Sequence, residues 1–274
     1  MDSATRFSLP ILLVLLVVFA AWFVIAWRRT QYTFLQACIY VVNLFFTRVL
    51  WRTQTSGSLP VINGQGAVIV SNHVSGIDPL LIQLCTNRVV HWMVAREYYE
   101  AFGISLIFRA LKSIPVNRGG IDTASTKLAI RLAQQGGLVG LFPEGRVNMT
   151  EELLLPGRPG AALIALRARV PVIPCYVSGA PYNGTALGSF FMTAHARVVV
   201  GKPIDLSNYY GRDHDKSVLG ELTKEFLIEV AKLAGVNDFE PKLAGRNWKP
   251  GDEDAENGSA GVTAEDEATT PDHP

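Results

Sequence analysis

The sequence predicts an α/β fold in which a mixed sheet is flanked by helices, preceded by a transmembrane helix and an interfacial helix. Between residues 67 and 234, short apolar runs of strand length alternate with stretches of helical length and period. This alternation is typical of a sheet covered by helices. The chain has 274 residues and is 49% hydrophobic, which is enough for one catalytic domain with appendages.

The N-terminal segment contains an uncharged apolar run from Leu9 to Trp27. As a helix this run would be about 28 Å long, close to the thickness of the hydrocarbon core of a bilayer. A cleaved signal peptide would have a shorter apolar region followed by a small-residue cleavage site. Arginines follow the run instead, and they favour a single-pass anchor in residues 1–30 with a cytoplasmic catalytic domain: Arg28, Arg29, Arg48 and Arg52.

Residues 31–58 are expected to connect this anchor to the domain. The stretch from Phe34 to Trp51 is apolar but interrupted by polar side chains, so we expect an amphipathic helix at the membrane surface. A buried core helix is the alternative. The stretch from Thr53 to Gly66 is rich in Gly, Ser, Thr and Asn, which is typical of a linker.

The expected catalytic domain, residues 59–248, contains the alternating elements. Six apolar runs have the length of buried strands: 67–71, 89–95, 113–116, 138–142, 171–177 and 196–201. Helices are expected between them, from about Pro79 and over residues 98–111, 123–135 and 160–168. A final amphipathic helix is expected over residues 216–234.

The C-terminal segment, residues 249–274, should be disordered because it has hardly any apolar residue large enough for a core. Residues 251–274 hold eight acidic side chains and no Lys or Arg, so the net charge of +1 conceals a basic body. Residues 1–250 contain 25 basic and 16 acidic side chains, a formal charge of +9. Such a body suits an anionic membrane surface or a phosphorylated substrate.

Two other classes of ligand are not expected. Nucleic acid is an unlikely fit for this composition, because no basic stripe is interleaved with aromatic residues. The three cysteines are widely spaced and odd in number, so they predict neither a disulfide framework nor a zinc site: Cys38, Cys85 and Cys175. They are expected to be small buried hydrophobes in a reducing compartment.

Three polar clusters follow predicted strands, at the ends where open α/β sheets bind their ligands. The first is NHVSGIDP, which contains His73 and Asp78. The second is NRGG, which contains Arg118, and the third is PEGR, which contains Glu144, Gly145 and Arg146.

His73 and Asp78 have the chemistry of a general base and its orienting partner. A hydroxyl that attacks a thioester must lose a proton, and imidazole suits that task near neutral pH. A carboxylate that accepts a hydrogen bond from the other ring nitrogen fixes the tautomer and stabilises the imidazolium. The alternative is that His73 is an ordinary polar residue and Asp78, followed by Pro79, is a helix N-cap.

The other two clusters offer contacts for a phosphorylated acceptor. Glu144 can accept a hydrogen bond from a glycerol hydroxyl, Arg146 can bind a phosphate, and Gly145 permits close backbone approach. Arg118 offers a second anion ligand in a glycine-containing loop. The alternatives are a surface turn with an ion pair and an isolated surface arginine.

The combination of NHVSGIDP, IPVNRGG, LFPEGRVN and VPVIPCYV, in this order, resembles the glycerolipid acyltransferase family that includes 1-acylglycerol-3-phosphate acyltransferases. The resemblance covers about residues 60–205. It implies that His73 is the base, Asp78 its partner, and Arg118, Glu144, Gly145 and Arg146 the acceptor-binding set. It also implies an acyl-CoA or acyl-carrier-protein donor, a lysophospholipid acceptor, a lipid bilayer as partner, and no metal or cofactor.

One departure from the family pattern bears on the acceptor. Many members have FPEGTR, whereas Arg146 directly follows Gly145 in this sequence. Three other functions therefore remain: acylation of another lysophospholipid or an amino-acid lysolipid, non-catalytic binding of membrane lipid, and hydrolysis of the thioester. A serine-based lipase is not expected, because the chain has no Gly-x-Ser-x-Gly motif.

Overall fold

The structure is a computed structural model that describes residues 3–60, 64–117, 122–185 and 188–245. Its centre is a seven-stranded sheet with the strand order β1-β7-β6-β2-β5-β3-β4. The strands are β1 (Gln54–Ser56), β2 (Ala67–Ser71), β3 (Val90–Ala95), β4 (Ile114–Val116), β5 (Leu138–Leu141), β6 (Val172–Ser178) and β7 (Arg197–Val200). Every neighbouring pair is parallel except β6 and β7, so the predicted mixed sheet is confirmed.

Eight α-helices are described: α1 (Ser3–Arg28), α2 (Phe34–Phe45), α3 (Asp78–Ile82), α4 (Arg96–Tyr99), α5 (Ser105–Ala110), α6 (Thr123–Gln134), α7 (Gly160–Ala168) and α8 (Lys216–Leu233). A π-helical turn, η1 (Phe46–Leu50), extends α2, and three short 3-10 turns are η2 (Gln83–Cys85), η3 (Gly188–Phe191) and η4 (Ser207–Tyr209). Most bounds agree with the prediction to within two residues.

Two segments differ from the prediction. The single helix expected over residues 98–111 is divided into α4 and α5, and Gly103 in the break has a φ of 87°, which a helix does not contain. The stretch expected to be a linker contains the edge strand β1, which pairs in parallel with β7. Its sequence, Gln-Thr-Ser, lacks the apolar character that reveals the other strands.

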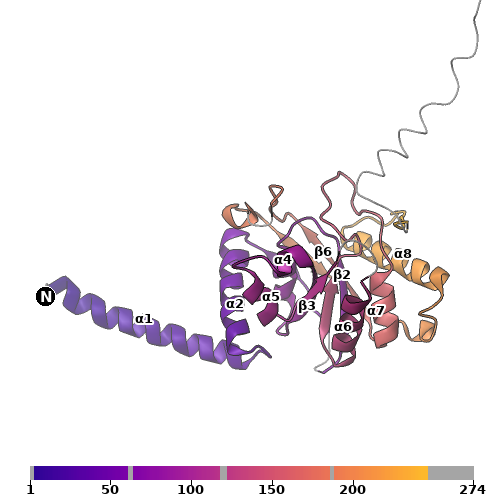
Figure 1. Cartoon of the computed structure of the whole chain (residues 1–274). Coiled ribbons are helices and arrows are strands. Elements are labelled where there is room, and N and C mark those ends of the chain that lie inside the picture. Colours follow the sequence, from indigo (N-terminus) through magenta and orange to yellow (C-terminus); the bar gives the residue numbers. More distant parts are fainter. Residues whose placement is uncertain (1–2, 61–63, 118–121, 186–187, 246–274) are drawn as a thin grey trace, which may run out of the picture. The chain divides into compact units, whose positions relative to one another are not determined.

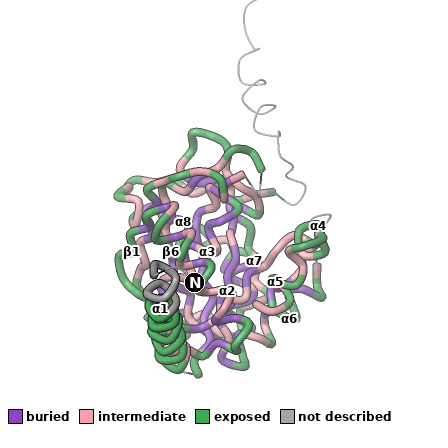
Figure 2. The backbone as a smooth tube through the Cα atoms, turned by 90° about the vertical axis from the view of Figure 1, so that its left-hand side faces the viewer, coloured by how far each residue is buried: buried purple, intermediate pink, exposed green. Residues whose placement is uncertain are grey.

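The two faces of the sheet have separate cores. Alternate side chains of β2 divide between them: Val68 and Val70 pack with residues of α6, α7 and α8, while Ile69 packs with residues of α3 and with Trp51. Figure 1 shows α6, α7 and α8 together on one side of the strands and α2 on the other. In Figure 2 the buried segments lie mainly in the middle of the body and the exposed segments at its margin. This arrangement leaves the carboxyl ends of the parallel strands free to carry a site.

Helix α2 has its polar side chains inside and its apolar side chains outside. Gln36 and Asn43 are buried, and they donate hydrogen bonds to the carbonyl oxygens of Ala110 and Leu80 at 2.8 and 3.0 Å. Five large apolar residues on the outer side of α2 and η1 are exposed: Phe34, Leu35, Val42, Phe45 and Val49. Phe46 and Leu50 of η1 pack against the core instead. One side of α2 therefore packs on the body while an apolar face remains open along the other side, and the position of this helix at a membrane surface stays a prediction.

Helix α1 is helical over the segment that was predicted to be a membrane anchor, and its described side chains are mostly exposed (Figure 2). Within the described residues, no helix has the length and apolar character needed to cross a bilayer. The single-pass anchor is thus not confirmed. The predicted acidic tail, residues 249–274, lies outside the described residues.

Candidate active site

The first and third polar clusters meet at the carboxyl ends of two neighbouring strands in the middle of the sheet. β2 and β5 are parallel neighbours with Val70 opposite Leu141, so the residues after both strands leave the sheet side by side. His73 follows β2 and Glu144 follows β5. β4 lies two strands away from β5 at the outer edge, and Arg118, which follows it, lies outside the described residues.

His73 and Asp78 form the hydrogen-bonded pair that the sequence predicts. The Nδ1 atom of His73 lies 2.9 Å from Oδ2 of Asp78. The backbone N–H groups of Val74 and Ser75 donate to the same oxygen at 2.8 Å each. Because the carboxylate accepts from Nδ1–H, the Nε2 atom is left as the nitrogen that can take a proton.

Asp78 does not act as the helix N-cap that was considered as an alternative. α3 begins at Asp78 itself, and Ile77 occupies the N-cap position. The carboxylate points back over the preceding turn toward His73, Val74 and Ser75. Complete burial raises the pKa of Asp78, while the hydrogen bonds from His73, Ser75 and Val74 oppose that shift.

The segment that contains His73 is anchored both to β6 and to the loop that follows β6. Asn72 pairs with the backbone of Val177 through two hydrogen bonds of 2.8 Å, one donated and one accepted. The hydroxyl of Ser75 donates to the carbonyl oxygen of Pro181 at 2.6 Å. Both side chains are buried, so the Asn and Ser of the NHVSGIDP motif fix the shape of the turn.

Residues of the loop after β5 also form hydrogen bonds with the main chain of His73. Its N–H donates to Oε1 of Glu144 at 2.7 Å, and its carbonyl oxygen accepts from the N–H of Asn148 at 2.6 Å. The other oxygen of Glu144, Oε2, accepts from the N–H of Leu155 at 2.9 Å. The carboxylate therefore joins the catalytic turn to the loop that follows β5.

The position of Glu144 points to a structural role beside the predicted contact with the acceptor. The residue is only 1% exposed and both of its oxygens accept from backbone N–H groups, so it does not face an incoming glycerol hydroxyl. Burial raises the pKa of Glu144 to about 7, although the N–H groups of Leu155 and His73 act in the opposite direction. Glu144 thus holds the main chain of His73 in place, and its contact with the acceptor stays a prediction.

Gly145 and Arg146 occupy the more accessible part of this loop. Gly145 is exposed and has a φ of 72°, a conformation that favours glycine. Arg146 is half-buried, and its charge is near enough to lower the pKa of Glu144 slightly. A Cβ atom on Gly145 would lie 3.4 Å from Nε of Arg158. Arg158 is therefore a second cation of this loop, which the sequence reasoning missed because it lies outside the motif.

An aromatic stack was also missed. The ring of Phe142 lies parallel to the imidazole of His73, with centroids 3.8 Å apart and an angle of 5° between the planes. Trp92 on β3 stacks on Phe142 at 4.8 Å and 15°. The only signal in the sequence is an aromatic residue directly after a buried strand, which does not reveal its partner.

The loop after β4 is closed at its ends by Asp122. One carboxylate oxygen accepts from the N–H of Asn117 and the other from the N–H of Ser125, each at 2.9 Å. These hydrogen bonds lower the pKa of Asp122 to about 2. Arg96 donates to the side-chain oxygen of Asn117 at 2.7 Å, so a described cation lies at the start of this loop.

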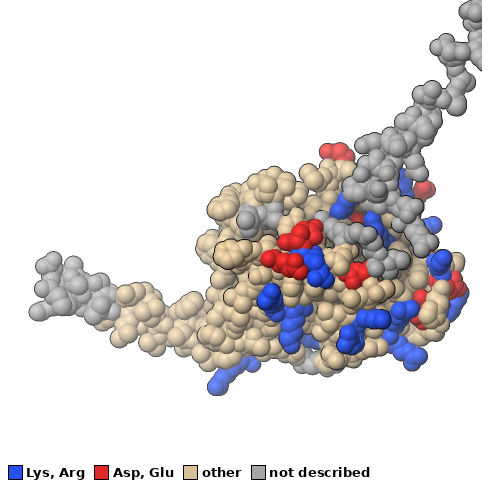
Figure 3. Space-filling view, in the orientation of Figure 1, with Lys and Arg blue, Asp and Glu red and all other residues tan. Residues whose placement is uncertain are grey.

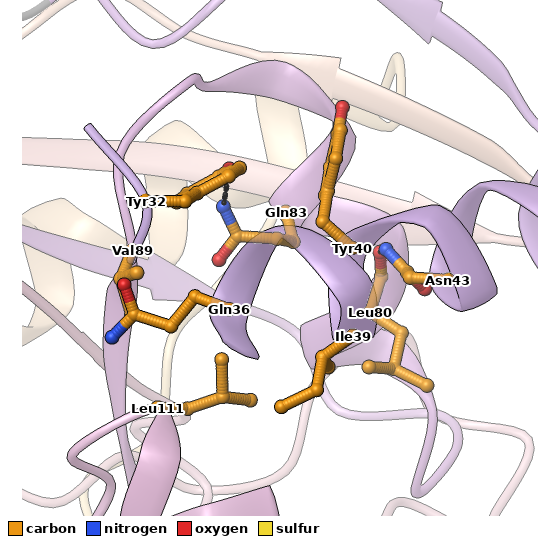
Figure 4. A pocket seen from close by; sticks show the side chains of 9 residues that line it. All are labelled: Tyr32, Gln36, Ile39, Tyr40, Asn43, Leu80, Gln83, Val89 and Leu111. Carbon is orange, nitrogen blue, oxygen red and sulfur yellow. Dashed lines mark hydrogen bonds between the residues drawn. The ribbon is translucent and has the colours of Figure 1, made fainter. Parts of the chain in front are cut away.

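A small cavity lies elsewhere, between α2 and the α3 region. Its volume is about 30 Å³, and none of the candidate site residues lines it. Figure 4 shows Gln36, Ile39, Tyr40 and Asn43 of α2 among the side chains that line it, together with the hydrogen bond from Gln83 to Tyr32. The space suits about one water molecule and is too small for an acyl chain. In the described part of the chain, no three His, Cys, Asp or Glu side chains are grouped as for a metal.

Comparison with known proteins gives one family. Residues 52–178 match the model of the Acyltransferase family, a range that includes β1 and every described candidate residue. The 1-acyl-sn-glycerol-3-phosphate acyltransferase of Bacillus subtilis is 26% identical over 53% of this chain and 69% of its own length. The human 1-acyl-sn-glycerol-3-phosphate acyltransferase beta is 30% identical over 53% of each chain, so the match spans about half of that relative.

A solved structure has the same fold. The 1-acyl-sn-glycerophosphate acyltransferase PlsC from Thermotoga maritima superposes with a TM-score of 0.56. The alignment covers 82% of this chain and 91% of that one, with 18% sequence identity.

Proposed function

We propose that this chain is an enzyme of the Acyltransferase family, whose model matches residues 52–178, and that it transfers a fatty acyl group to the free hydroxyl of 1-acylglycerol-3-phosphate, the activity for which two similar proteins are named. The product would be phosphatidic acid. The donor would be a thioester, acyl-CoA or acyl-carrier protein. The observation that supports this most directly is the 2.9 Å pair of His73 and Asp78, which leaves Nε2 available as a base.

The proposed reaction is direct transfer without an acyl-enzyme. Nε2 of His73 takes the proton of the acceptor hydroxyl while the oxygen attacks the thioester carbonyl. The tetrahedral intermediate then collapses, the carbon–sulfur bond breaks, and the imidazolium returns its proton to the leaving thiolate. Asp78 keeps the imidazole in the reactive tautomer and stabilises its positive charge.

The acceptor phosphate would be bound by arginines around this base. Arg146 lies on the same loop as Glu144, and Arg158 reaches Gly145 on that loop. Arg118 is proposed as a further ligand from the sequence alone. A guanidinium binds a phosphate through two parallel hydrogen bonds, which suits a monoester headgroup.

An acceptor panel tests this function. One labelled acyl-CoA is supplied with lysophosphatidic acid, lysophosphatidylethanolamine, lysophosphatidylcholine, an amino-acid lysolipid or no acceptor, and the products are separated by lipid chromatography. We expect label in phosphatidic acid. Label in another phospholipid would show that the acceptor is a different lysolipid. Thiol release that is equally fast with and without an acceptor would indicate a hydrolase.

We also propose that the enzyme works at the surface of a lipid bilayer. The support is the open apolar face of α2 together with the exposed apolar residues near α4 and α5: Tyr98, Phe102, Leu106 and Ile107. The bond from Gln36 to Ala110 ties α2 to α5, so the two apolar surfaces belong to one side of the body. Residues 10–27 of α1 include no charged side chain, and in Figure 3 Lys and Arg gather along the lower part of the body. We further propose that α1 is a single-pass membrane anchor and that the catalytic domain lies on the cytoplasmic side.

A further inference from the structure

We propose that Phe142 is a positioning residue for the catalytic base, and that the stack of Trp92, Phe142 and His73 fixes the imidazole plane and stabilises the imidazolium. This inference rests on the proposed role of His73 as the base. The geometry that carries it is the 3.8 Å separation and 5° angle between the rings of Phe142 and His73.

The stack depends on one glycine of the sheet, Gly140, which leaves room for the indole ring of Trp92. Trp92 of β3 lies opposite Gly140 of β5 in the register of the two strands. A Cβ atom on Gly140 would come within 2.6 to 2.8 Å of three atoms of the indole ring, so only glycine lets the ring lie across β5. Phe142 is two residues further along and therefore on the same face, where the indole supports it at 4.8 Å.

The stack restrains a motion that the hydrogen bonds leave free. The bond from Nδ1 to Asp78 fixes one edge of the imidazole ring, but the ring can still rock about that contact. A parallel ring at 3.8 Å blocks this rocking on one face. Nε2 then stays in one place, and a base held in place transfers protons more efficiently.

The stack also has an electrostatic effect. The face of an aromatic ring carries negative potential, which attracts a cation above it. His73 becomes cationic only after it takes the proton of the acceptor hydroxyl, so Phe142 would stabilise the reacting state more than the resting state. Trp92 is 5% exposed and keeps water from the far side of Phe142.

The first test is spectroscopic and does not depend on the reaction. The chain has five histidines, and the signals of His73 are identified by their loss in His73→Gln. In the full-length protein with labelled histidine, the ring protons of His73 should be shifted upfield by the face of Phe142. Phe142→Leu should abolish that shift and Phe142→Tyr should keep it. An unshifted His73 in the unmodified protein would overturn the proposal.

The second test is kinetic. Phe142→Leu should lower kcat about two- to thirtyfold with little change in the KM of either lipid substrate, and Phe142→Tyr should restore kcat. Phe191→Leu is the matched control, because Phe191 is 90% exposed and lies outside the stack of Trp92, Phe142 and His73. If His73→Ala is inactive but Phe142→Leu has normal kcat, the positioning role fails while the proposed function stands. If His73→Ala is fully active, the proposed function itself fails.

Discussion

At the scale of single residues, contacts to both the imidazole ring and the main chain hold His73 in place. Asp78 holds one ring nitrogen, Phe142 covers one ring face, and Glu144 and Asn148 hold the main-chain N–H and carbonyl groups. A base restrained in this way is preorganised, so little reorganisation is needed when the acceptor arrives.

Glu144 gives a prediction about pH. Burial raises its pKa from 4.5 to about 7, so ionising it costs more in the folded than in the unfolded chain. Its contribution to the free energy of unfolding is complete below pH 4.5 and is lost as the pH rises through about 7. The loss is on the order of 3 kcal/mol for a shift of this size.

The matched variant is Glu144→Gln, which cannot ionise. Thermal unfolding of both proteins in the same detergent at pH 4.5, 6, 7 and 8 should show the wild type losing stability relative to Glu144→Gln as the pH rises. Parallel curves would mean that Glu144 is ionised throughout, and that the N–H groups of His73 and Leu155 outweigh the effect of burial.

Arg146 gives a prediction about the acceptor. Replacing it by alanine removes a charge-assisted contact worth about 1.5 to 3 kcal/mol, so kcat/KM for the acceptor should fall about ten- to a hundredfold. Arg146→Lys should recover part of it, since lysine keeps the charge but not the bidentate geometry. Arg212→Ala, in a surface ion pair, is the control. A rise in the KM of the donor instead would place Arg146 at the thioester carrier.

At the scale of elements, the sequence predicted buried structure well and exposed structure less well. β2 and α7 have the predicted bounds because continuous apolar runs and a helical period define them. β1 was missed because Gln-Thr-Ser is stabilised only by pairing with β7, a contact that local sequence does not encode. The division of α4 from α5 was missed because the strong apolar signal continues across Gly103.

The outer face of α2 gives a prediction about membrane binding. Changing Leu35, Val42 and Phe45 together to serine or glutamine should lower binding to anionic vesicles at least tenfold, because each apolar side chain loses about 1.5 to 3 kcal/mol of burial. The unfolding temperature should hardly change, since these side chains are exposed.

A residue on the buried face of α2 supplies the control for the vesicle-binding experiment. Asn43→Ala removes a buried hydrogen bond to Leu80, so it should destabilise the fold by about 1 kcal/mol and leave vesicle binding unchanged. If the triple variant of the outer face unfolds instead, that face is packed within the protein and the membrane role is wrong.

At the scale of the whole molecule, the site depends on strand order. The residues that surround His73 come from the ends of β2 and β5, from β6 and from the loop after β6, which are neighbours only in the folded sheet. The sequence could predict the pairing of His73 with Asp78 because a motif marks both residues, whereas the role of Arg146 at the acceptor stays a prediction. It could not predict the support role of Glu144, or the contacts of Phe142 and Arg158, because these depend on distances between separate loops.

Truncation tests the proposed attachment of the whole enzyme. Removing residues 1–30 should leave the protein partly bound to membranes in low salt, because α2 and the α4–α5 region keep their exposed apolar residues. The fraction in the membrane pellet is the measurement. A truncated protein that is folded and entirely in the supernatant would restrict attachment to α1.

The central claim is that His73 and Asp78 act as one base, and single-turnover acyl transfer from labelled acyl-CoA to lysophosphatidic acid tests it most directly. General-base catalysis contributes about 10² to 10⁴-fold, so His73→Ala should lower the rate by that factor. Asp78→Asn can present the wrong tautomer and should lose most activity, and the double variant should be little worse than His73→Ala because the residues act together. Circular dichroism confirms that each variant is folded. Near wild-type transfer by folded Asp78→Asn, or multiplicative losses in the double variant, would contradict the account.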